Sequence, residues 1–292
     1  MRIRKECSMK TYYECVACLL RQTVEAASMM TESQDIQEKV LRRVLTEMAV
    51  MDLNKTPPHM ARLIHQYVRE ALDIADPYQA LKHDFNQLAL EMAEEMRKTI
   101  QQSDDPFQTA AKISIAGNII DFGVRNNITH DEVRETVAEC LNQALQGNTA
   151  EELSNAIEQS TQILFLGDNA GEIVFDRLLL EQMPLDHVTY VVKGKPIIND
   201  ATMEDAIEAG LPELVNVIDN GSDAPGTILD LCSPDFQERF TQADLIIAKG
   251  QANYETLSDE KDKNIYFLLK VKCPVIARDL RCDTGELVLK HI

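Results

Sequence analysis

The stretch ILFLGDNAGE, residues 163–172, decides how this chain folds. Four apolar residues lead directly into a turn that carries glycines, two acids and an amide, and a helical segment follows. A short, continuously apolar run before glycine is typical of a strand that is buried on both faces, as in parallel sheets. The turn after it could hold a cation, cradle a phosphate or simply cap the helix, because Asp, Asn and free backbone N–H groups suit all three roles.

Similar apolar runs recur in the second half of the sequence. They are VTYVV (188–192), LVNVI (214–218), DLIIA (244–248) and CPVIA (273–277). Helical or irregular segments separate the runs, and this alternation predicts a three-layer α/β/α sandwich with a mostly parallel sheet.

The first half of the chain carries a helical pattern instead, with apolar residues at helical spacing and no convincing strand. Two stretches predict helix starts, SDDPF (103–107) and the capping box THDE (129–132). We therefore expect a multihelical N-terminal subdomain, residues 1–158, packed against an α/β domain, residues 159–292, with a cleft shared between them.

Composition and charge exclude several classes of function. A net charge of −19 argues against a non-specific nucleic-acid binder and against binding to anionic membranes. No apolar run approaches the ~20 residues of a membrane span, and MRIRKECSMK (1–10) leads into no signal-peptide core. The seven scattered cysteines suggest reduced thiols. We expect a cytoplasmic protein without nucleic-acid or membrane partners, and the sequence leaves its oligomeric state open.

Polar turns follow four of the predicted strands. They read GDNAGE (167–172), KGKPIINDAT (193–202), DNGSDAPGT (219–227) and KGQANYE (249–255). In open α/β sheets ligands bind beyond the carboxyl ends of the strands. Any one of these turns could be only a helix cap, but four together favour a common binding cleft.

The residue types in these turns suit metal-assisted phosphate chemistry. Asp168, Asn169 and Asp200 could supply three oxygen ligands to a hard divalent cation and leave positions open for water and substrate. Lys193, Lys249 and the glycine-rich turns could hold an anion through ammonium and backbone N–H groups. A cation beside an anion cradle is the arrangement that phosphoryl transfer needs. Neither a Walker motif nor a Rossmann fingerprint is present.

Taken in order, these four turns resemble the motifs of the damage-control metal phosphatases. The likeness extends to YYECVACL (12–19) and ISIAGNIIDFG (113–123), and so covers nearly the whole chain. This resemblance implies a divalent-metal-dependent phosphatase that acts on small phosphate esters such as sugar phosphates, with Mn²⁺, Co²⁺, Ni²⁺ or Mg²⁺ as cofactor and a small phosphorylated metabolite as partner.

The resemblance also implies roles for single residues. The positions that match metal ligands are Asp168, Asn169 and Asp200, and those that match phosphate contacts are Lys249, Gly250, Asn253 and Lys272. The branch that acts on fructose phosphates carries Arg-Thr-x-Lys at the last of these, where this chain reads Leu-Lys-Val-Lys (269–272). The departure leaves the substrate open and points to the prokaryotic-type branch with paired N-terminal cysteines.

Other residues have less specific roles. Asn118 and Asp121 interrupt a helical segment, and either reach the cleft to bind substrate or water or bridge helices. The pair Cys15 and Cys18 is half a zinc site without a second half, so we expect packed thiols there. Asp205 is expected on a solvated helix face.

For the reaction, we expect Asp168, Asn169, Asp200 and Lys249 to be the catalytic residues, and metal-activated water is favoured over a carboxylate as nucleophile. Glu172 and Asp223 are candidate proton carriers or orienting groups. Three other functions stay open. They are a metal-dependent phosphotransferase, an S-adenosylmethionine-dependent methyltransferase, which the strand-end lysines disfavour, and a non-enzymatic metabolite-binding protein, which would need no metal.

Overall fold

The computed structural model describes residues 9–118 and 129–292 of the chain. The α-helices in these residues are α1 Tyr13–Met30, α2 Gln34–Val50, α3 Pro57–Leu72, α4 Gln79–Gln101, α5 Pro106–Gly117, α6 His130–Asn142, α7 Ala150–Gln159, α8 Glu172–Leu180, α9 Met203–Glu208, α10 Pro234–Gln242, α11 Gly250–Leu257 and α12 Pro274–Leu280. The strands are β1 Leu145–Gly147, β2 Ile163–Leu166, β3 Val188–Val192, β4 Asn216–Asp219, β5 Leu245–Lys249, β6 Ile265–Lys270 and β7 Leu287–His291.

These strands form one sheet in the order β1-β7-β6-β5-β2-β3-β4. Every neighbouring pair is parallel except β6 and β7. After β2 the chain adds β3 and β4 on one side, and it then returns to add β5 and β6 on the other. The strand order therefore reverses between β2 and β5, and such a reversal is where open α/β sheets bind their ligands.

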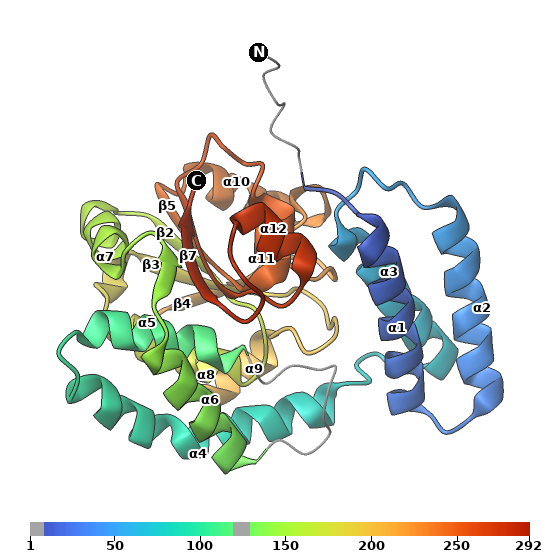
Figure 1. Ribbon diagram of the computed structural model, residues 1–292, viewed down its shortest axis with the longest axis horizontal. Helices are drawn as coiled ribbons and strands as arrows, with labels where there is room; N and C mark the ends of the chain where they lie inside the picture. Colours follow the sequence, from blue (N-terminus) through green and yellow to red (C-terminus); the bar gives the residue numbers. More distant parts are fainter. Residues whose placement is uncertain (1–8, 119–128) are drawn as a thin grey trace.

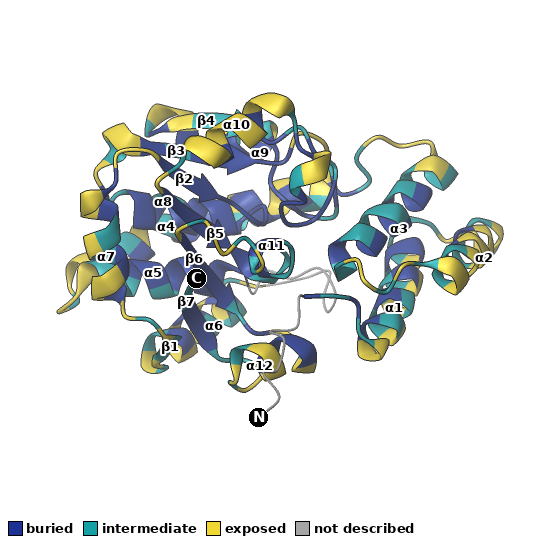
Figure 2. Cartoon of the chain, turned by 90° about the horizontal axis from the view of Figure 1, so that it is seen from above, coloured by how far each residue is buried: buried dark blue, intermediate teal, exposed yellow. Residues whose placement is uncertain are grey.

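Helices cover both faces of the sheet, with α4, α5, α6 and α8 on one face and α10, α11 and α12 on the other (Figure 1). Successive residues of β2 point to opposite faces, so Phe165 packs in the first core and Leu166 in the second. Because both faces are covered, the central strands are buried throughout (Figure 2). The predicted three-layer sandwich with a mostly parallel sheet is confirmed.

The helices α1, α2 and α3 lie together at one end of the molecule (Figure 1). They enclose a small core of their own, which includes Val44 and Ile64. The other early helices, α4 to α6, pack on the sheet instead. The helical first half is thus divided between two places, and the expected domain limit at residue 158 stays a prediction.

Two expectations about strands are wrong. The run CPVIA (273–277) begins α12 and is not a strand, with Pro274 in the first helical turn. Proline is favoured there because the first N–H groups of a helix have no intrahelical partner. In the second half of the chain, β6 and β7 were not among the predicted strands. The three-residue edge strand β1, in the half where no strand was expected, is too short and too exposed to show an apolar run.

The expected helix starts at SDDPF and THDE are confirmed. Asp105 accepts a hydrogen bond from the N–H of Gln108, and Thr129 and Glu132 form a reciprocal capping box. None of the helices in residues 9–118 and 129–292 combines the length and the apolar character that a membrane span requires.

Candidate active site at the strand-order reversal

The turns that follow β2 and β3 lie against each other. Ala201 donates its N–H to the carbonyl oxygen of Asp168 at 2.8 Å, and Asn169 pairs with Asp200 in a short antiparallel bridge. The side chains of Asp168, Asn169 and Asp200 are all buried. The fold therefore brings together the three residues that match metal ligands, from two separate turns.

Asn118, the residue that follows α5, joins this group. Its Nδ2 donates to Asp168 Oδ2 at 2.7 Å and to Glu172 Oε2 at 2.5 Å. The side chain of Asn169 donates to the same two oxygens, at 3.0 and 3.1 Å. Two amides therefore hold the two carboxylates side by side. Asp121, the other candidate from the same segment, lies outside the described residues.

Two buried oxygens here lack a hydrogen-bond donor among residues 9–118 and 129–292. They are Asn118 Oδ1 and Asp200 Oδ2, although Lys193 Nζ lies 3.4 Å from the latter. A buried oxygen without a donor costs roughly 1–3 kcal/mol, so such atoms in native structures point to a water or an ion. Together with Asp168 and Asn169, these atoms form the carboxylate and amide oxygen set that hard divalent cations prefer.

In the described part of the chain, no three His, Cys, Asp or Glu side chains are grouped to hold a metal. The candidate site does not depend on such a group, because only Asp168 and Asp200 contribute carboxylates to it. A cation there would take its other ligands from amide oxygens, water or substrate, as Mg²⁺ commonly does.

Burial raises the pKa values of the acids at this site. It raises the pKa of Asp168 to about 6, and the negative charge of Asp200 adds to the effect. The pKa of Asp200 rises to about 6 and that of Glu172 to about 7, in both cases because burial outweighs a neighbouring lysine. Neighbouring buried carboxylates with raised pKa values are typical of functional sites.

Lys249 lies deeper than a direct phosphate contact would require. It is fully buried, and its Nζ donates to Glu172 Oε1 at 2.7 Å, to the carbonyl of Ser114 at 3.0 Å and to Asp176. Asp176 also accepts a hydrogen bond from Tyr190 at 2.7 Å. The charge of Lys249 is thus committed to two buried acids, and its contact with phosphate stays a prediction.

Gly250 and Asn253 fasten the turn after β5 to the site. Gly250 has a φ of +78°, and a Cβ on it would overlap the carboxylate of Asp168. Asn253 is fully buried, accepts a hydrogen bond from Thr227 Oγ1 at 2.8 Å and donates to the carbonyl of Lys249 at 2.8 Å. Its amide is engaged within the protein, so its substrate contact also stays a prediction.

Lys272 is exposed, yet it lies near enough to Asp168 for its charge to lower the pKa of that carboxyl. The sequence reading did not single out Glu255, whose pKa burial raises to about 7 with a further contribution from Asp168. Gln251 donates to Glu255 at 2.8 Å and accepts from the Lys272 N–H at 3.1 Å. In the sequence, the one signal for Glu255 is its place at the end of the polar segment KGQANYE (249–255), which begins α11.

Asp223, a candidate proton carrier, is paired with two arginines of α3. Arg69 lies 3.0 Å from one carboxylate oxygen and Arg62 contacts the other. Arg69 also donates to the carbonyl of Pro196 at 2.9 Å. Because both oxygens are engaged, Asp223 links α3 to the loop after β4 and does not suit proton transfer.

The expectation that Asp205 is solvated is wrong. Only 4% of this residue is exposed, and its carboxylate accepts hydrogen bonds from the N–H and hydroxyl of Thr202 at 2.8 and 2.7 Å. An acid at the third position of a helix that begins inside the protein caps that helix and cannot face water. Lys82 neutralises it at 3.0 Å.

The paired cysteines lie on α1. Cys15 is buried and Cys18 is half-buried, and burial raises the pKa of the Cys15 thiol. A thiol with a raised pKa is largely protonated and unreactive near neutral pH. All six cysteines in the described residues are free.

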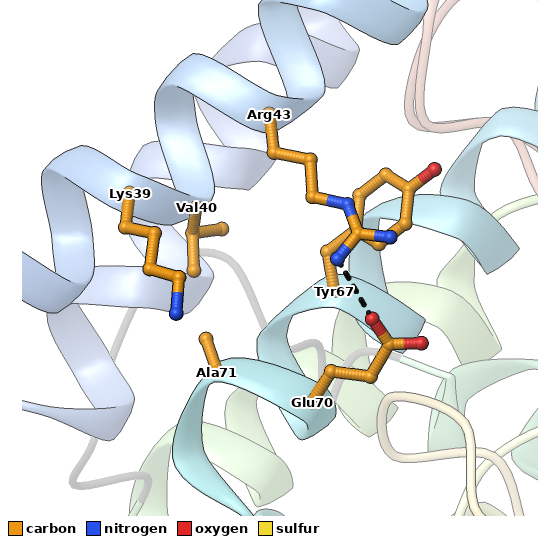
Figure 3. A pocket seen from close by; sticks show the side chains of 6 residues that line it. All are labelled: Lys39, Val40, Arg43, Tyr67, Glu70 and Ala71. Atoms are coloured by element: carbon orange, nitrogen blue, oxygen red, sulfur yellow. Dashed lines mark hydrogen bonds and ion pairs between the residues drawn. The ribbon is translucent and has the colours of Figure 1, made fainter.

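A separate small pocket lies between α2 and α3 (Figure 3). It has a volume of about 60 Å³ and is lined by Lys39, Val40, Arg43, Tyr67, Glu70 and Ala71. The Arg43 guanidinium lies 3.9 Å from the centre of the Tyr67 ring and 2.9 Å from Glu70. These contacts hold α2 against α3, and Glu70, the one acid among the lining residues, is paired with Arg43.

The sheet and the polar turns after its strands define an α/β protein with an oxygen-rich site at the reversal of strand order. Comparison with known proteins then identifies the family. The Damage-control phosphatase ARMT1-like domain matches residues 11–288. The chain therefore belongs to this family, and the resemblance seen in the motifs is confirmed.

Individual relatives cover almost the full chain. The damage-control phosphatase of Archaeoglobus fulgidus is 36% identical over 97% of this chain and 100% of its own length. A damage-control phosphatase of Pyrococcus horikoshii is 36% identical over 96% of this chain and 97% of its own. The crystal structure of a DUF89 family protein from Pyrococcus horikoshii superposes with a TM-score of 0.88, at 35% identity over 97% of this chain and 99% of that one. These relatives support a phosphatase role.

Proposed function

We propose that this chain is a divalent-metal-dependent phosphatase that hydrolyses small phosphate esters, such as sugar phosphates or related metabolites. The observation that carries the proposal is the meeting of Asp168, Asn169 and Asp200 beside two buried oxygens that lack a donor within residues 9–118 and 129–292. The names of the relatives support the phosphatase part.

The donor set fits Mn²⁺, Co²⁺, Ni²⁺ or Mg²⁺. Asp168, Asn169 and Asp200 would hold the ion, with Asn118 Oδ1 as a further oxygen. When bound, such an ion polarises phosphorus and neutralises negative charge on the phosphoryl group. The raised pKa values of Asp168 and Asp200 fit this role, because two adjacent buried carboxylates ionise more readily beside a cation.

The remaining work falls to residues of the chain. Lys272, exposed near Asp168, would attract the phosphate group of the substrate. The helix α11 begins at Gly250, beside Asp168, so its first N–H groups favour an anion there. Glu172, held by two amides and by Lys249, would orient Asp168 and Asn169. Water would be the nucleophile, because the ligand carboxylates are engaged.

The partner in this proposal is a small phosphorylated metabolite. A net charge of −19 disfavours nucleic acid and anionic membranes, while one cation and one lysine can invert the field locally. The six free cysteines of the described residues favour a reducing compartment such as the cytoplasm.

The test is a panel of phosphate esters assayed with each of the four metals. We expect metal-stimulated phosphate release from at least one ester. In Asp168→Asn the rate of release should fall about 100-fold or more, because losing a metal ligand costs more than losing a residue that only orients one. Asp186→Asn removes an exposed carboxylate in the single 3-10 turn Leu185–His187, which precedes β3, and should match the wild type. Absence of metal stimulation with every ester, or equal release by Asp168→Asn, would refute the proposal.

A further inference from the structure

Asn86 lies on α4, far from the motif turns in the sequence, and is fully buried. Its Oδ1 accepts a hydrogen bond from the N–H of Gly171 at 2.7 Å. Its Nδ2 donates to Asp205 Oδ1 at 3.1 Å and to Glu208 Oε2 at 2.7 Å. The orientation of the amide follows from its partners, since Gly171 N can only donate and the ionised carboxylates only accept.

The partners of Asn86 belong to the turn after β2 and to α9, the helix that begins directly after the turn that follows β3. Gly171 follows Asp168 and Asn169 in the turn after β2, and it is the N-cap of α8. Asp205 caps the start of α9 by accepting hydrogen bonds from Thr202, and Thr202 lies two residues after Asp200. One side chain of α4 therefore joins the first turn to the helix that directly follows the second turn.

Lys82, one helical turn before Asn86, makes this contact possible. It is 2% exposed and pairs with Asp205 at 3.0 Å and with Asp76 at 2.9 Å. Its charge compensates the burial of Asp205, which would otherwise be costly. The face of α4 that carries Lys82 and Asn86 thus holds the start of α9, directly after the second turn, by an ion pair and joins it to the first turn by an amide.

We propose that Asn86 is a positioning residue that sets the spacing between the turn that carries Asp168 and Asn169 and the turn that carries Asp200. Without its amide, the buried N–H of Gly171 loses its acceptor and Asp205 loses a donor, so both turns relax independently. The effect on metal binding rests on the proposed function, whereas the coupling of the two turns does not.

The experiment compares Asn86→Ala with Gln87→Ala. Gln87 is the next residue of α4 and donates to the same Glu208 at 2.7 Å, but its contact is exposed. Mn²⁺ binding to the metal-free proteins is measured by calorimetry. We expect about tenfold weaker binding for Asn86→Ala, as for other residues that support metal ligands, and wild-type binding for Gln87→Ala.

Two further readouts separate positioning from general damage. The Mn²⁺ concentration for half-maximal phosphate release should rise about tenfold in Asn86→Ala, while kcat at saturating Mn²⁺ stays close to the wild type. Amide exchange at Gly171 should accelerate in Asn86→Ala and stay unchanged in Gln87→Ala. If Asn86→Ala does not fold, Asn86→Asp serves, because it keeps an acceptor for Gly171 but places a carboxylate against Asp205 and Glu208.

Wild-type Mn²⁺ affinity in the Asn86 variants, or an equal loss in Gln87→Ala, would overturn the proposal. If the wild-type protein itself binds no Mn²⁺, the proposed metal dependence fails. Amide hydrogen exchange at Gly171 then tests the role of Asn86 independently of metal binding. Faster exchange at Gly171 in Asn86→Ala would then support the coupling of the turns, and unchanged exchange would reject it.

Discussion

Gly250 is a residue at which a single methyl group would disturb the site. Its φ is +78°, and a Cβ would overlap the carboxylate of Asp168. For Gly250→Ala we therefore expect loss of Mn²⁺ binding and a fall in phosphate release of about 100-fold, as for loss of a ligand's support. Calorimetry measures Mn²⁺ binding, and the phosphate-ester assay measures phosphate release.

Gly285 provides the matched control. Its φ is +97°, and a Cβ there would meet no atom of the described residues within 4 Å. Both alanine variants carry the strain of a left-handed backbone, about 1–2 kcal/mol, but only Gly250→Ala strikes Asp168. Equal losses of activity in the two variants would show that backbone strain, and not the overlap, is responsible.

His65 predicts a pH dependence of stability. Burial lowers its pKa from 6.5 to about 3 in the folded protein. Below pH ~6.5 the unfolded chain therefore binds a proton that the folded chain does not bind. The contribution of His65 to the free energy of unfolding is fully present above that pH and is lost as the pH falls toward 3. Between pH 6.5 and 4.5 the free energy of unfolding of the wild type should fall by about 2 kcal/mol more than that of His65→Gln.

Urea unfolding of both proteins across this pH range measures the effect. Other titrating groups are common to the two proteins and cancel in the difference. If the free energy of unfolding of both proteins changes with pH in the same way, His65 takes up its proton in the folded protein as well. That result would contradict the effect of its burial beside Tyr78, whose hydroxyl lies 3.0 Å from Nδ1.

At the scale of the elements, the junction of β5 and α11 carries a fully buried charge, that of Lys249. Lys249 compensates Glu172 of α8 and Asp176 one turn further, and all three are fully buried. Lys249→Met leaves both acids without their cation, so we expect a loss of about 3–5 kcal/mol in the free energy of unfolding. Adding Asp176→Asn should restore part of it, because one uncompensated charge is removed.

Urea denaturation of the single and double variants measures this interaction. A double variant less stable than Lys249→Met alone would mean that Asp176 stabilises the fold through Tyr190 and Ser114 and not through Lys249.

Element prediction succeeded where burial on two faces leaves a continuous apolar run, as in β2, β3 and β5. It failed for CPVIA (273–277), because a run of four or five apolar residues suits a helix start as well as a strand. The strand β1 has too few residues to form a pattern at all.

At the scale of the whole molecule, Asp223 joins the helices α1–α3 to the loop that follows β4. It bonds Arg62 and Arg69 of α3 in half-buried ion pairs. Asp223→Asn should weaken this attachment by about 1–3 kcal/mol, the range for hydrogen bonds to charged groups. Hydrogen exchange should then accelerate in α1–α3 while the strands keep their protection.

Asp235→Asn is the control, since it removes an Asp–Arg pair that is exposed and lies within α10. The two variants lose the same type of pair, and only one of these pairs connects α3 to the loop after β4. Unchanged exchange in α1–α3 for Asp223→Asn would show that the other contacts of these helices, which include the bond from Arg69 to Pro196, suffice to hold them.

By itself, the sequence determined the strand–turn–helix units, the layered α/β class and the oxygen-rich turns, because each rests on residues that are neighbours along the chain. The tertiary structure decided which turns meet, that Lys249 lies beneath the site and that Asn86 of α4 joins Gly171 to Asp205. Such contacts join residues far apart in sequence. A hydrogen bond between distant residues leaves no period in either segment, so only the folded chain reveals it.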